Sequence, residues 1–255
     1  MLPQRLIDRF HELLAAAAAA GEPEPTAMSL ATVDDQGQPW VRVVLLKALD
    51  ARGFSFYTNT DSDKGRQLAG QPRAAICFLW KHLDQVVQVR AQGPVEAVDA
   101  AEADAYFASR PRGSQIGAWA SAQSRPLADR ATLEQRIGEV EARFQGVPVP
   151  RPAHWGGYRL LPQRLEFWHG RENRLHDRLR FSRAGDGWRR ERLARRAGNH
   201  GRSPRGLRVS MGRHDLLPRL AADAADGSFQ SHRTGLPRAR RWPALCGDAV
   251  LRPLG

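Results

Sequence analysis

Residues 40–59 read WVRVVLLKALDARGFSFYTN, which is two β-like runs with a turn signal between them. The runs span residues 40–49 and 53–59, and Asp50-Ala51-Arg52-Gly53 separates them. Similar runs occur at residues 28–33, 73–80 and 86–98, again bounded by turn signals. Several short strands at this spacing favour an antiparallel sheet or barrel over alternating βαβ units.

Helical segments surround these strands. The opening stretch RLIDRFHELL places Leu6, Phe10, Leu13 and Leu14 at helical spacing. The apolar run at residues 13–21 could instead belong to a signal peptide, but the acids before it favour an amphipathic helix. Further helices are predicted at residues 62–70, 99–110 and 127–145, and strand character returns at residues 155–170, 177–183 and 187–194. The predicted fold is mainly β with peripheral helices.

The positive charge is concentrated at the C-terminal end of the chain. The 255 residues carry a formal net charge of +12. Residues 195–255 hold 12 Arg, 4 Asp and no Lys or Glu, which is +8, so the first 194 residues carry only +4. This Arg-rich tail is rich in Gly and Pro and has no sustained periodicity, so we predict that it is disordered and separate from a domain at residues 1–194. A shifted reading frame or lost stop is one explanation for the tail, and a basic arm for RNA or anionic surfaces is the other.

The sequence lacks the motifs that metal sites, disulfide frameworks and membrane spans require. Cys77 and Cys246 form no metal-ligand spacing and no H-E-x-x-H motif occurs, so neither a metal site nor a disulfide framework is predicted. No run approaches the roughly 20 apolar residues of a membrane span. We therefore expect a cytoplasmic protein without membrane contact.

Three clusters of hydrogen-bond donors have few acids near them. In the first, RVVLLK (42–47), strand alternation puts Arg42, Val44 and Leu46 on one face and Val43, Leu45 and Lys47 on the other. Two solvated charges beside a core strand would give the same pattern.

The second cluster is YFASRPRGSQIGAW (106–119), where we expect a helix to end at Arg110 and a loop to follow Pro111. Arg110 and Arg112 have no acid within the loop to pair with. Tyr106, Arg110 and Ser114 can converge as a phenol, a guanidinium and a hydroxyl, which suits a phosphate monoester. The alternative is a helix C-terminus whose dipole favours basic residues.

The third cluster is EFWHGRENRLHDR (166–178), which contains Trp168. A strand pattern would align Arg174, His176 and Arg178 on a single face. A polar outer strand face, with His176 merely hydrogen-bonded, is the alternative. Together the three clusters suggest a phosphorylated, planar ligand.

RVVLLK, FYTN, YFASRPRGSQIGAWAS and EFWHGRENRLHDR, in this order, closely resemble the pyridoxine/pyridoxamine 5′-phosphate oxidase family. The resemblance runs from about residue 6 to Ala194 and places the start of this chain within the family's first helix. It implies a split β-barrel that forms a homodimer with FMN at the subunit interface.

The resemblance also implies residue roles. The FMN-binding set would be Arg42, Val43, Val44, Leu45, Lys47, Tyr57, Thr58, Lys64, Gln88, Gln123, Ser124, Trp168 and Arg178. The substrate-binding set would be Lys47, Tyr106, Arg110, Ser114, Arg174, Leu175 and His176. Arg174 and His176 would be the catalytic pair, because they are the candidates to orient the reacting C4′ substituent.

The sequence departs from the family pattern at three places. Asp63 stands where the family usually has an arginine beside the flavin phosphate, so FMN affinity is expected to suffer. The segment WKHLDQVVQV (80–89), which contains Gln88, is about two residues longer than the commonest form. Arg195 stands where the family's closing proline belongs, and the Arg-rich tail follows it.

The implied reaction is oxidation of pyridoxine 5′-phosphate or pyridoxamine 5′-phosphate to pyridoxal 5′-phosphate, with O2 as acceptor and H2O2 as product. One alternative is a split-barrel flavoenzyme that acts on a phenazine-type substrate. The other is a non-enzymatic, basic nucleic-acid-binding protein, which the modest charge of the first 194 residues argues against. Nucleic acid is then expected as a partner only of the tail.

Overall fold

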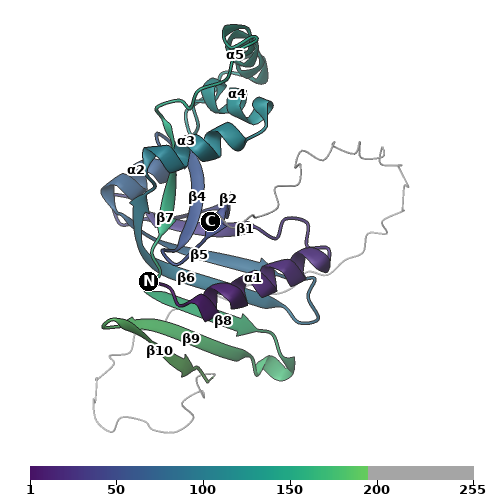
Figure 1. Ribbon diagram of the computed structural model, residues 1–255, viewed down its shortest axis with the longest axis vertical. Helices are drawn as coiled ribbons and strands as arrows, with labels where there is room; N and C mark the ends of the chain where they lie inside the picture. The colour runs from purple at the N-terminus through teal and green to yellow at the C-terminus, as the bar shows by residue number, and fades with distance from the viewer. Residues whose placement is uncertain (195–255) are drawn as a thin grey trace, which may run out of the picture. The chain divides into compact units, whose positions relative to one another are not determined.

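A curled antiparallel sheet forms the body of the protein (Figure 1). The computed structural model describes residues 1–194, so the predictions for the tail at residues 195–255 lie outside the described part. The strands are β1 (Ala27–Val33), β2 (Pro39–Leu45), β3 (Ala48–Leu49), β4 (Phe54–Asn59), β5 (Arg73–Trp80), β6 (Val87–Ala97), β7 (Trp155–Leu160), β8 (Arg164–His169), β9 (Asp177–Ala184) and β10 (Gly187–Arg192). The helices are α1 (Gln4–Ala19), α2 (Asp63–Gly70), α3 (Ala100–Ser109), α4 (Arg112–Ala120) and α5 (Arg130–Arg143), with a 3-10 turn η1 (Glu172–Arg174).

The strand pairing closes part of the sheet into a barrel. One path of neighbours runs β10-β9-β8-β6-β5-β1-β2, and a second runs from β6 through β7 and β4 to β3. The strands β2 and β3 are consecutive in the chain, and between them the Lys47 N–H donates to the Ser55 carbonyl at 2.9 Å. The barrel therefore runs from β1 through β5, β6, β7, β4 and β3, and closes back onto β1 through β2. The strands β8, β9 and β10 extend the sheet outside this barrel.

The long strand β6 belongs to both paths. Its first half pairs with β8 and its last residues pair with β7. The change of partner falls at Gly93, where a Cβ atom would lie 2.0 Å from the Leu161 carbonyl oxygen. Only glycine allows this close approach of two backbones.

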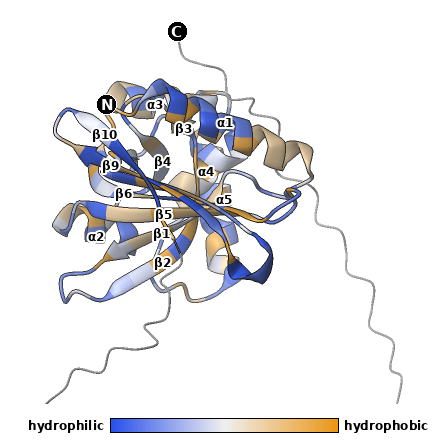
Figure 2. Cartoon of the chain, turned by 90° about the horizontal axis from the view of Figure 1, so that it is seen from below, coloured by the Kyte–Doolittle hydropathy of each residue, from blue (hydrophilic) through white to orange (hydrophobic). Residues whose placement is uncertain are grey.

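Aromatic packing under α1 forms the main core. Phe10 of α1 is fully buried, and its ring lies 5.0 Å from Phe78, 5.4 Å from Phe54 and 5.6 Å from Trp80, measured between centroids. Figure 2 shows the apolar and polar sides of α1. The predicted helix with its buried Leu6, Phe10, Leu13 and Leu14 is confirmed.

A second apolar cluster holds the helices α3, α4 and α5 against the β4–β7 end of the sheet. It consists of Phe107, Ile116, Phe144, Val149 and Trp155. In Figure 1 these three helices gather together, away from α1. This cluster fixes the position of the segment that contains Tyr106, Arg110 and Ser114.

The segment after Pro111 is a helix, α4, so the predicted loop is wrong. Proline is accepted at the start of a helix because it has no N–H to leave unpaired and its φ is already close to the helical value. Pro111 occupies the N-cap position, and the helix buries Gln115 and Ile116. The other predicted helices are confirmed, and none of the described helices is long and apolar enough to cross a membrane.

Candidate functional site

Four of the predicted cofactor residues meet at the start of α2, in a group we call the cationic cradle: Arg42, Thr58, Lys64 and Gln123. The Lys64 ammonium donates to Ser62 Oγ at 3.0 Å and to Gln123 Oε1 at 3.2 Å. Thr58 Oγ1 donates to the same Gln123 oxygen at 3.3 Å. The guanidinium of Arg42 donates to Gln67 Oε1 at 3.0 Å and to Thr32 Oγ1.

The cationic cradle is electrostatically prepared for an anion. Lys64 is only 7% exposed, and burial together with the charge of Arg42 lowers its pKa to about 8. Burial also lowers the pKa of Arg42. The carboxylate of Asp63 opposes both shifts, but it is itself paired with Arg66. A bound phosphate would stabilise both cations in their charged forms.

The second group of predicted residues, Tyr57, Tyr106 and Arg110, packs around stacked aromatic rings. Tyr57 stacks on Tyr106 with centroids 4.1 Å apart and on Trp155 at 5.4 Å. The guanidinium carbon of Arg110 lies 4.8 Å from the centroid of Trp155. Sequence reasoning missed Trp155, whose only signal was an aromatic residue at the start of a predicted strand. We call these four residues the aromatic stack.

Arg110 in the aromatic stack has a hydrogen-bond donor that no described residue accepts from. Its Nη1 is buried and has no hydrogen-bond partner among the described residues, and burial lowers the pKa of the guanidinium. A buried, unsatisfied cation is costly unless a ligand supplies the missing acceptor. The arrangement therefore suits an anionic group bound beside the Trp155 ring.

The neighbouring Arg112 differs from Arg110. Its guanidinium donates to the Val147 carbonyl at 3.0 Å and to the Phe144 carbonyl, which ties α4 to the end of α5. The expectation of two unpaired arginines in this segment is therefore wrong for Arg112. Ser114 is exposed in the first turn of α4, and its hydroxyl makes no hydrogen bond to the described residues.

The remaining predicted residues of this part of the chain lie in or near β2. Val43 is 65% exposed, Val44 packs against the main core, and Leu45 ends the strand half-buried. Lys47 lies between β2 and β3, and its ammonium makes no hydrogen bond to the described residues. Ser124 lies in the loop after α4 with a left-handed φ of 66°.

The third group lies on the sheet face that carries the exposed Val41, Val43 and Leu79, which we call the outer face. Gln88 on β6 is directly opposite Leu79 and Trp168, and Trp168 is directly opposite Arg178. Directly opposite residues of antiparallel strands point to the same face. Trp168, Arg174, His176 and Arg178 line a hollow of about 280 Å3.

Arg174 and His176 reach this hollow from a turn. Arg174 ends η1 with φ 59°, directly after Asn173 with φ 54°, so the prediction of one strand aligning Arg174, His176 and Arg178 is wrong. Leu175 is 67% exposed. The His176 ring lies 4.5 Å from Trp168, and its Nδ1 accepts the Arg171 N–H at 3.1 Å, which leaves the proton of the neutral ring on Nε2.

A single chain does not bring the outer-face hollow and the cationic cradle together. Arg42 is in register with Leu30, which pairs with the buried Ile76 on the inner face, whereas Trp168 and Arg178 lie on the outer face. In addition β2 and β8 are four strand spacings apart along the sheet, which is roughly 19 Å. The two groups could share a ligand only if a second subunit supplied one of them.

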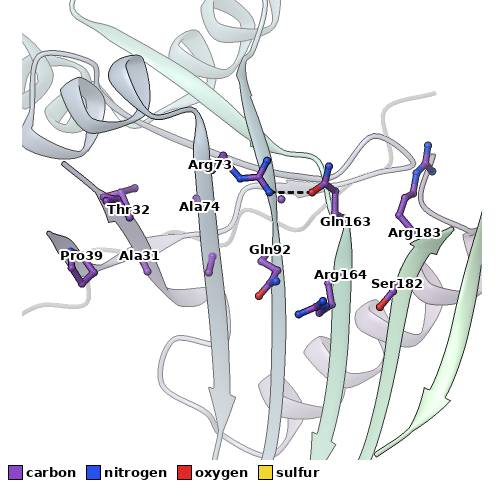
Figure 3. Close-up of a pocket in the computed structure, with 13 residues that line it drawn as sticks. Ala31, Thr32, Pro39, Arg73, Ala74, Gln92, Gln163, Arg164, Ser182 and Arg183 are labelled. Atoms are coloured by element: carbon purple, nitrogen blue, oxygen red, sulfur yellow. Dashed lines mark hydrogen bonds between the residues drawn. The ribbon is translucent and has the colours of Figure 1, made fainter. Parts of the chain in front are cut away.

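A larger hollow, of about 630 Å3, crosses the outer face at the Arg73 end of β5 (Figure 3). Arg73 donates to Gln163 Oε1 there at 3.2 Å, and Gln92, Arg164 and Ser182 come from the neighbouring strands. None of the predicted site residues lines it.

Comparison with known proteins agrees with these observations. Residues 14–144 match the family described as pyridoxamine 5′-phosphate oxidase, and residues 155–194 match the pyridoxine 5′-phosphate oxidase C-terminal dimerisation region. The pyridoxine/pyridoxamine 5′-phosphate oxidase of Myxococcus xanthus is 56% identical over 193 residues, which is 76% of this chain and 93% of the relative.

Two solved structures share the fold. PhzG from Burkholderia lata, in complex with tetrahydrophenazine-1-carboxylic acid, has a TM-score of 0.69 and 34% identity, and the match covers 76% of this chain and 93% of that one. A pyridoxamine 5′-phosphate oxidase-related, FMN binding protein from Nostoc punctiforme has a TM-score of 0.59 and 17% identity, and the match covers 73% and 97% of the two chains. The fold is thus a split β-barrel, and the chain belongs to the pyridoxine/pyridoxamine 5′-phosphate oxidase family.

Proposed function

We propose that this protein is an FMN-dependent oxidase that converts pyridoxine 5′-phosphate or pyridoxamine 5′-phosphate to pyridoxal 5′-phosphate. The alcohol reacts with O2 to give the aldehyde and H2O2, and the amine reacts with O2 and water to give the aldehyde, ammonia and H2O2. The 56% identity to the Myxococcus xanthus enzyme supports this substrate class over the phenazine type, for which the identity to PhzG is 34%.

The observation that carries the proposal is the presence of two partly desolvated cationic sites, each of which includes a residue of β4. Lys64 and Arg42 are partly desolvated in the cationic cradle, which fits the phosphate of FMN. The buried Nη1 of Arg110 in the aromatic stack fits a second phosphate, that of the substrate. Tyr57 of the stack and Thr58 of the cradle are consecutive residues of β4, so this strand contributes one side chain to each group, from opposite faces of the strand.

The remaining contacts would come from a partner subunit in a homodimer. The outer-face hollow with Trp168, Arg174, His176 and Arg178 would cover the cofactor held in the partner's cradle. The match of residues 155–194 to a dimerisation region supports this assembly, and so does the exposure of Val41 at 71% and Val43 at 65% on the same face. A cytoplasmic location agrees with a cofactor and substrates of intermediary metabolism.

The residues contribute mainly by binding and orientation. When bound, FMN supplies the acceptor for the two electrons removed at the C4′ carbon. Arg110, Lys47 and Ser114 would bind the substrate phosphate far from that carbon, so that binding energy fixes the ring in place. The Nε2–H of His176 and the guanidinium of Arg174 would donate to the C4′ substituent and orient it.

The test is direct. The purified protein should show flavin absorbance, release FMN on denaturation, and produce H2O2 and an aldehyde when pyridoxine 5′-phosphate is added under air. Turnover of a dihydrophenazine carboxylate without turnover of either B6 vitamer would instead favour the phenazine-type alternative. A colourless protein that binds RNA in a salt-sensitive way would favour the nucleic-acid alternative.

A further inference from the structure

A carboxylate bonded to Arg178, one of the residues that line the outer-face hollow, has no role in the function described so far. Glu166 on β8 is a buried acid, with a side chain only 7% exposed. It accepts from Arg178 Nε at 2.8 Å and pairs with Arg90 Nη2 at 2.8 Å. Sequence reasoning did not single it out, although it is the one acid among Arg164, Glu166 and Trp168, the outer-face residues of β8.

The strand register explains why Glu166 is available to Arg178. Glu166 lies directly opposite Arg90 on β6 and Arg180 on β9. The guanidinium of Arg180 turns away and pairs with Glu191 on β10, at 2.8 Å from Nη2 and 3.1 Å from Nε. The diagonal neighbour Arg178 instead reaches Glu166 Oε1, the same oxygen that Arg90 contacts, and diagonal spacing in an antiparallel sheet allows this for a long side chain.

The contact fixes one end of Arg178 and leaves the other end open. Only the Nε of Arg178 bonds to Glu166, and its two terminal nitrogens make no hydrogen bond to the described residues. Arg178 lines the hollow together with Trp168, Arg174 and His176. A guanidinium held at Nε keeps its terminal N–H groups in one plane and direction.

We propose that Glu166 is a positioning residue that orients Arg178 so that the terminal nitrogens of its guanidinium donate into the outer-face hollow. This inference rests on the proposed function, in which that hollow covers FMN bound by the partner subunit. Without the Glu166 carboxylate, Arg178 keeps its charge but loses its fixed direction.

The first experiment needs no cofactor. In the isotope-labelled apoprotein, the Nε–H signal of Arg178, identified by its loss in Arg178→Lys, should be downfield and slow to exchange. Glu166→Gln should move this signal upfield and speed its exchange at least about tenfold, because a neutral acceptor replaces a charged one. Glu191→Gln is the matched control, because it breaks the same kind of pair at Arg180 and should leave the Arg178 signal in place. An unchanged Arg178 signal in Glu166→Gln overturns the inference.

The second experiment measures FMN binding to the apoprotein by quenching of flavin fluorescence. Glu166→Gln should weaken binding about fivefold or more, and Arg178→Ala should weaken it at least as much. In the Arg178→Ala background the same Glu166 change should add less than about twofold, because residues that act through one another are not additive. Additive effects would show a general structural role and contradict the inference. If the wild-type protein binds no FMN at all, the proposed function fails, while the signal of Arg178 still decides whether Glu166 orients it.

Discussion

At the scale of single residues, two neighbouring arginines have different proposed roles: Arg110 is proposed to bind the substrate phosphate, whereas Arg112 ties α4 to the end of α5. Arg110→Ala should raise KM for pyridoxine 5′-phosphate about 10- to 100-fold with kcat changed less than about threefold, because the lost contact is to the phosphate rather than to the reacting carbon. Arg174→Ala should lower kcat about tenfold as well, because it is proposed to orient the C4′ substituent. Steady-state kinetics of both variants show whether each change acts on KM alone or on kcat as well.

Arg112→Ala is the matched control for Arg110→Ala. Its guanidinium binds the carbonyls of Phe144 and Val147, so the variant should lose stability and leave KM within about twofold. If Arg112→Ala raised KM as strongly as Arg110→Ala, the substrate phosphate would have been assigned to the wrong arginine.

The pKa of Lys64 predicts how FMN binding depends on pH. In the apoprotein this pKa is lowered to about 8, and a bound phosphate would raise it. Above pH 8 binding must therefore take up a proton, and the Kd for FMN should rise by up to about tenfold per pH unit. Below pH 8 Lys64 is charged in both states and contributes no such dependence. The same shift means that the apoprotein gains stability as pH rises from about 8 toward the ordinary lysine value, since the unfolded chain then binds more protons.

Lys64→Arg tests this origin of the pH dependence. An arginine keeps its charge throughout the range, so titration of FMN into this variant should give a Kd that changes little between pH 7.5 and 9.5. A wild-type slope that persists in Lys64→Arg would assign the dependence to another group.

Asp63 predicts a variant that binds FMN more tightly than the wild type. Its carboxylate acts on both Arg42 and Lys64, so it repels an incoming phosphate. Asp63→Asn should lower the Kd for FMN about two- to tenfold, an effect kept modest because the side chain is 41% exposed. Asp61→Asn removes an equal charge two residues away and should change the Kd less. Weaker binding in Asp63→Asn would mean that the pair with Arg66 supports the cationic cradle rather than opposing it.

At the scale of elements, the strands could be predicted because apolar and polar side chains alternate wherever only one face of the sheet is buried. The run at residues 73–80 became β5 with the same bounds, and its buried and exposed residues alternate along the strand. The run at residues 40–49 divides into β2, which pairs with β1, and β3, which pairs with β4. The run at 155–170 divides into β7, which pairs with β4 and the end of β6, and β8, which pairs with the first half of β6 and with β9. Such a change of partner depends on residues distant in sequence, so periodicity alone does not locate it.

The residue types of the candidate site can be recognised in the sequence, whereas the way the structure groups those residues in space cannot. The helix α4 was missed because Pro111, Gly113 and Gly117 favour a turn locally, and the burial of Ile116 against Phe107 and Phe144 decides the outcome. Arg174 was placed on a strand because alternation continues through residues 174–178, but the left-handed φ of Asn173 and Arg174 ends that regularity. The pairing of Arg112 with the carbonyls of Phe144 and Val147, just beyond the end of α5, likewise has no signal in the sequence around Arg112.

The change of partner along β6 gives a prediction about stability. Gly93→Ala places a Cβ atom against the Leu161 carbonyl, which is backbone and cannot rotate away. The variant should lose about 2–4 kcal/mol of stability and melt roughly 5–15 °C lower when followed by circular dichroism. Gly138→Ala in α5, where the added methyl meets nothing within 4 Å, should be neutral or slightly stabilising. Similar melting of the two variants would mean that the sheet shifts to relieve the contact at Gly93.

At the scale of the whole molecule, Arg42 of the cationic cradle and Arg178 of the outer-face hollow lie on opposite faces of the sheet, so the proposed site would need two subunits. Arg42→Ala should disable the cradle of a subunit, and Arg178→Ala should disable its hollow. When the two variants are co-expressed with different affinity tags, the purified heterodimer contains one site built from two intact halves and one built from two defective halves.

This heterodimer should bind about one FMN per dimer and recover about half of the wild-type activity, whereas each variant alone is deficient. A heterodimer of Arg42→Ala with Lys64→Ala is the control, because both changes lie in the cradle and every site then contains a defect. Recovery in the first pair and none in the second follows only if cradle and hollow meet across the interface. A first pair as inactive as its parents would place the whole site within one chain, which the strand spacing and the opposite facing of Arg42 and Arg178 argue against.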